Sequence, residues 1–181
     1  MTRSGRNSLR DLVLAALFLA IALVLPLVTG QIRTIGKMLL PMHLPVLLCG
    51  FLLGWRYGLA VGFLAPLLRS GIFGMPIFYP GAVGMAFELA AYGAVAGLLA
   101  EKLPSKPGWI YADLLIAMVS GRLVWGAVRF GMLAFGTEFS LPLFLAGAVT
   151  ESIPGIVLQI VLVPPLVLAL RRVIPRGEAV L

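Results

Sequence analysis

The stretch Gly121-Arg122-Leu123-Val124-Trp125-Gly126-Ala127-Val128-Arg129-Phe130 lies in an apolar run that is long enough to cross a membrane. Its two arginines are seven residues apart, close to two helical turns, so Arg122 and Arg129 share a helix face roughly 10 Å apart along the axis. Trp125 lies between them on nearly the same stripe. A cation at bilayer depth costs at least about 2.5 kcal/mol and normally faces a protein interior or a cavity. This face is therefore either a structural ion-pair site or a functional one.

The composition excludes an ordinary soluble protein. The chain has 181 residues, of which 61% are hydrophobic and 12% charged, and its mean hydropathy is +1.07. Soluble domains are about 45–50% apolar and about 25% charged. We therefore expect an all-α integral membrane protein, with residues 1–181 forming a single transmembrane domain of about six spans. The net charge of +7 indicates topology and not nucleic-acid binding, because the basic residues mostly flank apolar runs.

The apolar runs and the breaks between them predict six helices. The polar segment 29–42 is long for a connection in a compact membrane protein and could form a lid. The last helix contains Pro154-Gly155 and Pro164-Pro165, which predict a kinked or broken helix. Cys49 lies in an apolar helix and is interpreted as a small core residue. The expected helices cover residues 9–28, 43–53, 58–72, 82–99, 109–135 and 141–173.

Small residues recur at helical spacing on three of these helices. Ala16-x-x-x-Ala20 lies on the first, Gly58-x-x-x-Gly62 on the third and Gly93-x-x-x-Gly97 on the fourth. Small residues at this spacing allow another helix to approach closely in lipid. From spacing alone, the alanine pair fits a contact within the bundle as well as a contact with another protein.

The charges outside the apolar runs predict the orientation. The loops on one side hold only Arg33 and Lys37, whereas nine basic residues lie on the other side. The positive-inside rule then places both termini in the cytoplasm of a multi-pass plasma-membrane protein. The first helix is interpreted as retained and not as a cleaved signal peptide, because more spans follow. The nine basic residues are Arg3, Arg6, Arg10, Arg56, Lys102, Lys106, Arg171, Arg172 and Arg176.

With this orientation, the sequence predicts how deep each charged residue lies in the bilayer. Counting turns from the helix ends places Arg129 level with Glu88 and Glu151, with Arg122 two turns beneath. Asp113 falls near the inner end of its helix and is expected at the interface. The ionisable and polar residues expected in the outer half of the membrane are His43, Arg69, Glu88, Arg122, Arg129 and Glu151.

Three buried arginines against two buried carboxylates leave an excess of positive charge. Pairing each of the two carboxylates, Glu88 and Glu151, with an arginine would be a purely structural arrangement. The surplus favours an anionic or carboxylate-bearing ligand, since arginine offers a fixed fork of donors. Trp125 and Tyr92 could supply aromatic walls, although each also fits simple packing. The predicted substrate-binding residues are Arg69, Glu88, Tyr92, Arg122, Trp125, Arg129 and Glu151.

Catalysis has little support in the sequence. There is one histidine, and neither a zinc-protease His-Glu-x-x-His motif, a Gly-x-Ser-x-Gly elbow nor a Walker-type phosphate loop is present. We expect no bound metal or cofactor. Without a phosphate loop the chain has no ATPase of its own, and it shows none of the internal repeats common in ion-coupled carriers. If it pumps, a partner must supply the energy.

Several strings resemble the substrate-binding (S) components of energy-coupling factor (ECF) vitamin transporters. The resemblance covers nearly the whole chain, including a small-residue first helix and a long first loop. The strings are moderately specific as a set and weak one at a time. They are Met42–Gly50, Pro66–Ser70, Met85–Ala90, Gly121–Gly126 and Pro154–Gln159.

The resemblance implies a high-affinity, outward-opening binding subunit that is not an enzyme. It also implies a lipid bilayer around the chain, a membrane coupling subunit and two cytoplasmic ATPases that use ATP. In this family an Ala-x-x-x-Ala motif of the first helix contacts the coupling subunit, which Ala16 and Ala20 match. The pocket residues are not implied by the resemblance, because members bind different vitamins.

The arginine excess favours a carboxylate-bearing vitamin or precursor such as pantothenate. The alternative is a stand-alone secondary carrier or channel for a small anionic solute, with the same charges lining its path. A membrane enzyme that uses Glu88 or Glu151 as a general acid or base lacks a supporting motif. A structural or assembly role also remains open at this stage.

Overall fold

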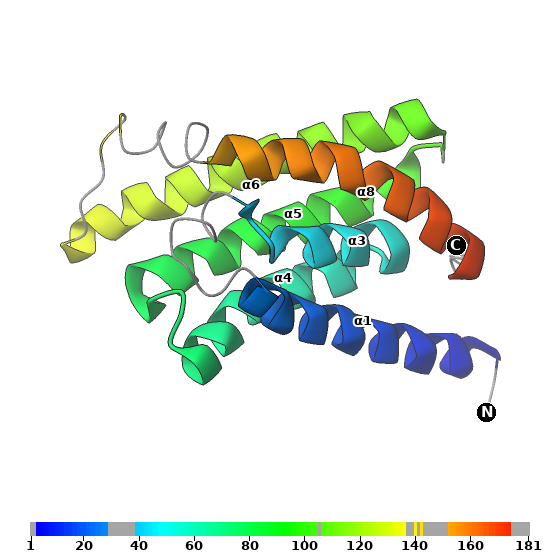
Figure 1. Ribbon diagram of the computed structural model, residues 1–181, viewed down its shortest axis with the longest axis horizontal. Helices are drawn as coiled ribbons and strands as arrows, with labels where there is room; N and C mark the ends of the chain where they lie inside the picture. The colour runs from blue at the N-terminus through cyan, green and yellow to red at the C-terminus, as the bar shows by residue number, and fades with distance from the viewer. Residues whose placement is uncertain are drawn as a thin grey trace.

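The computed structural model describes residues 3–28, 39–104, 106–136, 140, 142 and 152–174. Within these ranges the protein is all-helical, with six α-helices (Figure 1). A π-helical turn, η1 (Phe78–Ala82), precedes α5, and a 3₁₀ turn, η2 (Met132–Phe135), follows α6. The α-helices are α1 (Arg3–Val28), α3 (His43–Leu53), α4 (Trp55–Phe73), α5 (Val83–Lys102), α6 (Pro107–Gly131) and α8 (Ile153–Val173).

Four helical segments are long and apolar enough to cross a membrane. They are Ser8–Leu27, Phe78–Lys102, Pro107–Ala134 and Ile153–Val173. Helix α3 has 11 residues, a length of roughly 16 Å, against a hydrocarbon core of about 30 Å. Helix α4 carries Arg56 and Arg69 and is not among the four. The described helices therefore comprise four candidate spans and two that do not meet this criterion.

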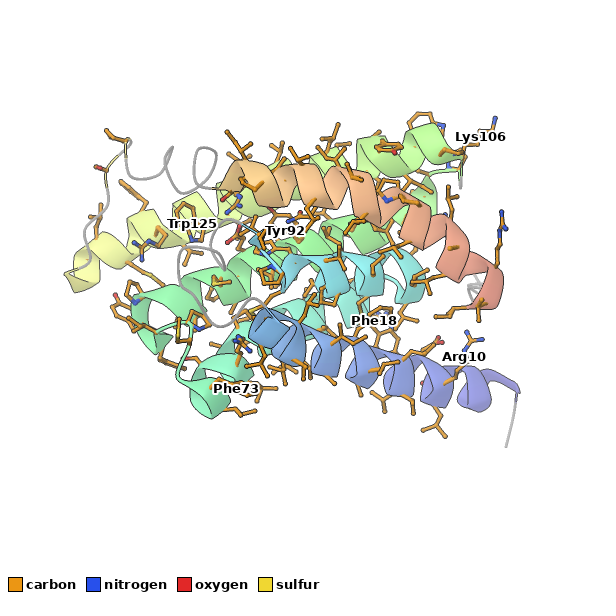
Figure 2. The ribbon with its side chains drawn as sticks, viewed as in Figure 1. Arg10, Phe18, Phe73, Tyr92, Lys106 and Trp125 are labelled. Carbon is orange, nitrogen blue, oxygen red and sulfur yellow. The ribbon has the colours of Figure 1, made fainter. Side chains whose placement is uncertain are left out.

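Helix α5 runs through the middle of the bundle and contacts α3, α4 and α6. Helix α1 packs on α3 and α4, and α8 packs on α3 and α6 (Figure 1). Helix α1 begins and α8 ends at the same end of the bundle, where Figure 2 also places Arg10 and Lys106. The core between the helices includes Phe51, Leu89 and Leu114, each at most 1% exposed.

Glycines set the close approach of α4 to α5. A Cβ at Gly93 would lie 2.2 Å from the carbonyl oxygen of Gly58, and a Cβ at Gly62 would lie 2.3 Å from that of Leu89. At Gly97 it would lie 2.3 Å from the amide nitrogen of Trp55. The close-packing face predicted for Gly58-x-x-x-Gly62 is thus confirmed, and it packs against the face of α5 that carries Gly93 and Gly97.

The prolines of α8 lie at two places, in its first turn and in its interior. Helix α8 begins at Ile153, so Pro154 lies in its first turn, where its missing N–H costs no hydrogen bond. Pro154-Gly155 therefore lies in the first turn of α8, and residues 143–151 before it lie outside the described part of the chain. Pro164 and Pro165 lie inside α8, and the helix changes direction along its length (Figure 1). Glu151 and the predicted lid residues Arg33 and Lys37 lie outside the described residues.

Asp113 is buried inside the bundle near the start of α6, and its interfacial depth stays a prediction. Helix α6 begins at Pro107, so Asp113 is more than a turn inside the helix and is 1% exposed. It lies within electrostatic reach of Arg171 of α8, whose guanidinium also donates to the carbonyl oxygen of Phe51 at 3.5 Å. These contacts join α3, α6 and α8 near the end of the bundle where the termini lie. Cys49 is fully buried, as expected of a core residue.

Candidate functional site

Glu88 of α5 is the centre of a buried group of charged and polar side chains. Its Oε1 atom lies 2.7 Å from Nη1 of Arg122 on α6. The same oxygen lies 3.5 Å from Nε2 of His43, the first residue of α3. The side chains of His43 and Glu88 are 1% and 2% exposed, and that of Arg122 is 14% exposed. One carboxylate therefore joins three helices.

Tyr92 lies one helical turn from Glu88 on the same face of α5. Its ring meets the His43 ring edge to face, with centroids 5.0 Å apart at an angle of 89°. Tyr92 is fully buried, near the centre of the bundle in Figure 2, and its hydroxyl lies within electrostatic reach of Glu88 and Arg122. We call His43, Glu88, Tyr92 and Arg122 the polar cluster.

The opening stretch of α6 positions this cluster. A Cβ at Gly121 would lie 2.2 Å from the Tyr92 ring and 3.1 Å from the backbone oxygen of Glu88. Glycine at 121 thus lets the Tyr92 ring approach the backbone of α6 closely, next to Arg122. On α3, the His43 amide donates to the carbonyl of Leu40 at 3.0 Å, and Leu40 has a positive φ of 50°. This backbone conformation is unusual for leucine and fixes where α3 begins.

The second arginine of the stretch lies above the cluster and does not pair with Glu88 in the structure. The Arg129 guanidinium lies over the Trp125 ring, 5.9 Å from its centroid. Both side chains lie near Gly84, one helical turn before Glu88 on α5. The prediction that Arg129 lies at the same depth as Glu88 is therefore wrong by one helical turn. Arg122, and not Arg129, forms the ion pair with the Glu88 carboxylate. Turn η1 extends the helical segment before α5 outward to Phe78, beyond the start at residue 82 assumed in the count, which explains the shift.

Arg69 contacts residues outside the polar cluster. It is 3% exposed, and its Nη1 donates to the carbonyl oxygen of Leu23 on α1. Pro26, three residues further along α1, interrupts the helical hydrogen bonding in this turn. The Arg69 guanidinium also lies 5.0 Å from the Phe73 ring centroid. These contacts fit a residue that fastens α1 to α4. The predicted role of Glu151 remains a prediction, since that residue is outside the described ranges.

Several polar atoms of the cluster have no hydrogen-bond partner in the described part of the chain. They are Nε and Nη2 of Arg122 and Nδ1 of His43, whereas the Tyr92 hydroxyl lies within hydrogen-bonding reach of the Arg122 side chain. Buried polar atoms are nearly always satisfied, so such a group of exceptions requires an explanation. Nη1 of Arg122 contacts Glu88, and Nε and Nη2 have no well-aligned acceptor among the described residues. The arrangement can therefore hold a ligand that brings acceptor atoms to Arg122.

The site prediction missed one residue of the polar cluster, and it did not consider a second buried polar side chain. His43 was placed in the outer half of the membrane but not assigned to the site, although it contacts Glu88 and Tyr92. Gln159 of α8 is 1% exposed, and neither of its amide atoms has a partner among the described residues. The sequence could have drawn attention to Gln159, because it is a glutamine inside an apolar helix and an amide in hydrocarbon requires a hydrogen-bond partner.

The fold and site define a membrane-embedded binding protein. The helices surround a buried cluster whose free groups are hydrogen-bond donors and acceptors, and no group of three metal-ligating side chains occurs in the ranges described. The family described as "ECF transporter, substrate-specific component" matches residues 10–167, and the chain belongs to this family. It is a multi-pass membrane protein and the substrate-binding subunit of a transporter, not an enzyme. Comparisons with curated proteins and with solved structures give no match.

Proposed function

We propose that this S component binds a small, water-soluble vitamin or precursor that carries a carboxylate, with pantothenate as the leading candidate. The observation that supports this most is the pair of unpartnered donors on Arg122. Nε and a terminal nitrogen of a guanidinium lie side by side and match the two oxygens of a carboxylate. Because Nη1 already holds Glu88, a ligand carboxylate would complete the coordination of Arg122.

Charge balance supports an anionic ligand. Within the polar cluster, Glu88 neutralises Arg122. Arg129 lies one turn above, against Trp125. Because no carboxylate of the described residues pairs with Arg129, an added carboxylate between Arg122 and Arg129 would compensate this second cation, whereas a cationic ligand would not. Trp125 and Arg129 are therefore proposed as the outer part of the site.

The proposed orientation places both termini in the cytoplasm and the polar cluster in the outer half of the membrane. Basic residues Arg10 and Lys106 lie at the end of the bundle where α1 begins and α8 ends (Figure 2), and such residues favour the cytoplasmic side. The cluster lies nearer the opposite end, at the N-terminus of α3. In this orientation, six helices in one domain form a site that receives its ligand from outside the cell.

The proposed partners are a membrane coupling subunit and two cytoplasmic ATPases, which hydrolyse the ATP. Helix α1 offers the docking face: Ala16 and Ala20 are exposed, whereas Ala15, Phe18 and Ala22 are buried against the bundle. The two alanines therefore point away from their own fold. Their small side chains would allow a helix of the coupling subunit to approach closely.

Tryptophan at position 16 or 20 is expected to abolish co-purification with the coupling subunit and leave the isolated protein folded. A large ring on this exposed face would hold the partner helix away without disturbing the core. Pull-down of the coupling subunit with tagged Ala16→Trp and Ala20→Trp measures the effect. Ala169→Trp, at an exposed position of α8, is the matched control. Equal capture by all three variants would exclude this docking face.

The vitamin itself is identified by thermal unfolding of the purified protein with a panel of water-soluble vitamins. A ligand at one hundred times its Kd stabilises a protein by about 2.7 kcal/mol, a shift that is readily measured. We expect stabilisation by pantothenate or another carboxylate-bearing member and none by cationic thiamine. Stabilisation by cationic vitamins alone would reject the proposal. Uptake in cells that lack every ECF coupling subunit would support a stand-alone carrier instead.

A further inference from the structure

Gln159 of α8 carries two buried polar atoms that no described residue satisfies. The residue is 1% exposed, and neither its amide oxygen Oε1 nor its amide nitrogen Nε2 has a hydrogen-bond partner in the ranges described. Buried polar atoms are rarely left unmatched, because each one gives up its hydrogen bonds to water. Neither the polar cluster nor the proposed carboxylate site makes use of this amide.

The buried face of α8 directs Gln159 toward α3 and α6. Buried residues recur every fourth position along this helix, which places them on one face. Because α8 packs on α3 and α6, this face meets the helix that begins at His43 and the helix that carries Arg122. The buried residues at this spacing are Gly155, Gln159, Val163 and Val167.

The contact between α6 and α8 gives the depth of Gln159 relative to Arg122. Asp113 of α6 lies within electrostatic reach of Arg171 of α8, and the two helices run in opposite directions (Figure 1). From this level, Gln159 lies twelve residues back along α8, roughly 18 Å. Arg122 lies nine residues forward along α6, roughly 14 Å in the same direction. The two residues are therefore within about one helical turn of the same depth.

The contact between α3 and α8 leads to a similar depth. Arg171 donates to the carbonyl oxygen of Phe51 at 3.5 Å, and α3 runs in the same direction as α8 (Figure 1). His43 lies eight residues before Phe51, roughly 12 Å along the axis, on the side where Gln159 lies. Gln159 is thus at the outer edge of the polar cluster, on the face of α8 that packs against α3 and α6.

The chemistry of an amide side chain limits what can complete it. Its oxygen accepts hydrogen bonds and its NH2 group donates them. A carboxylate could only accept, an ammonium could only donate, and an alkyl chain could do neither. A neutral amide on the ligand carries both a donor and an acceptor. Such a group adds no charge, so it leaves the charge balance at Arg122 unchanged.

We propose that Gln159 is a substrate-binding residue that recognises an amide group of the ligand, while Arg122 holds the carboxylate. This inference rests on the proposed binding of a carboxylate at Arg122 and adds a second requirement to it. The substrate is then an amide-bearing carboxylate whose two groups are only a few bonds apart. Pantothenate, in which two methylene groups join the amide to the carboxylate, belongs to this class.

Leucine at position 159 separates recognition from a structural role. Gln159→Leu nearly keeps the size of the side chain and removes both polar atoms. Because it leaves no buried polar atom unmatched, the ligand-free variant should melt at or above the temperature of the wild type. Ile160→Leu, at the adjacent partly buried position of α8, is the matched control. Isothermal titration of the purified full chain uses pantothenate and an analogue in which two methylene groups replace the amide.

The wild type is expected to prefer pantothenate over this analogue by about tenfold or more. Gln159→Leu should lose most of this preference by weakening pantothenate binding alone, and Ile160→Leu should keep it. Unchanged pantothenate affinity in Gln159→Leu would overturn the inference and leave carboxylate binding intact. A clearly lowered melting temperature of the ligand-free Gln159→Leu protein would also overturn it, because the amide would then have a structural partner. Binding of neither probe by the wild type would overturn the pantothenate proposal and this inference with it.

Discussion

Alanine in place of Gly93 is expected to prevent α4 and α5 from packing. The added Cβ would lie 2.2 Å from the backbone oxygen of Gly58, and the Gly93 carbonyl is itself in close contact with Gly50 and Gly58. Backbone atoms of two buried helices cannot move aside as a flexible side chain can. Overpacking of a core costs typically 1–3 kcal/mol, and a backbone clash at the central helix should reach about 3 kcal/mol or more, a large part of a stability of roughly 5–15 kcal/mol.

The measurement is size-exclusion chromatography of the Gly93→Ala protein in detergent, together with its melting temperature. We expect loss of the monodisperse peak or a strongly lowered melting temperature. Gly71→Ala is the matched control, because a Cβ at that exposed helical position would meet no atom within 4 Å. It should be neutral or slightly stabilising, since alanine is the better helix former. Identical behaviour of the two variants would contradict the close packing described for α4 and α5.

Replacing Glu88 by glutamine should be the most damaging change within the polar cluster. The amide keeps the size of the carboxylate but removes the charge that Arg122 contacts at 2.7 Å and that His43 faces at 3.5 Å. Removing one partner of a buried ion pair costs about 3–5 kcal/mol, because the other charge is left uncompensated. Thermal unfolding of Glu88→Gln should therefore begin at a clearly lower temperature than that of the wild type.

Two further variants test this explanation. Glu101→Gln alters an exposed carboxylate that accepts from the Trp55 amide at 3.4 Å and should change the melting temperature little. The double variant Glu88→Gln/Arg122→Met should be more stable than Glu88→Gln alone, because it no longer buries an unpaired cation. A Glu88→Gln protein as stable as the wild type would show that the ion pair is not a structural element of the bundle.

The sequence predicted the packing of the helices better than it predicted the site. Glycine spacing alone identified the two faces that meet between α4 and α5, because only a missing Cβ permits that approach. Hydropathy identified the membrane class, and the resemblance identified the family, which matches residues 10–167. Each of these features is local in the sequence or shared across a family.

The partners of individual charges could not be predicted in the same way. Counting turns from assumed helix ends placed Arg129 level with Glu88, whereas Arg122 is the arginine that contacts it. An error of one turn moves a side chain by about 5 Å, enough to exchange one arginine for the other. Arg69 was assigned to the site by its depth, but its contacts are with Leu23 of α1 and with Phe73. Depth says nothing about which helix a side chain faces.

The most direct test of the central claim is the affinity of the Arg122→Lys protein for pantothenate. Lysine keeps a cation for Glu88 but lacks the fork of donors, so the unpartnered Nε and Nη2 positions are lost. We predict a melting temperature close to that of the wild type without ligand and an affinity reduced by about tenfold or more in equilibrium binding. An unchanged affinity in a folded Arg122→Lys protein would show that Arg122 only pairs with Glu88 and that the ligand binds elsewhere.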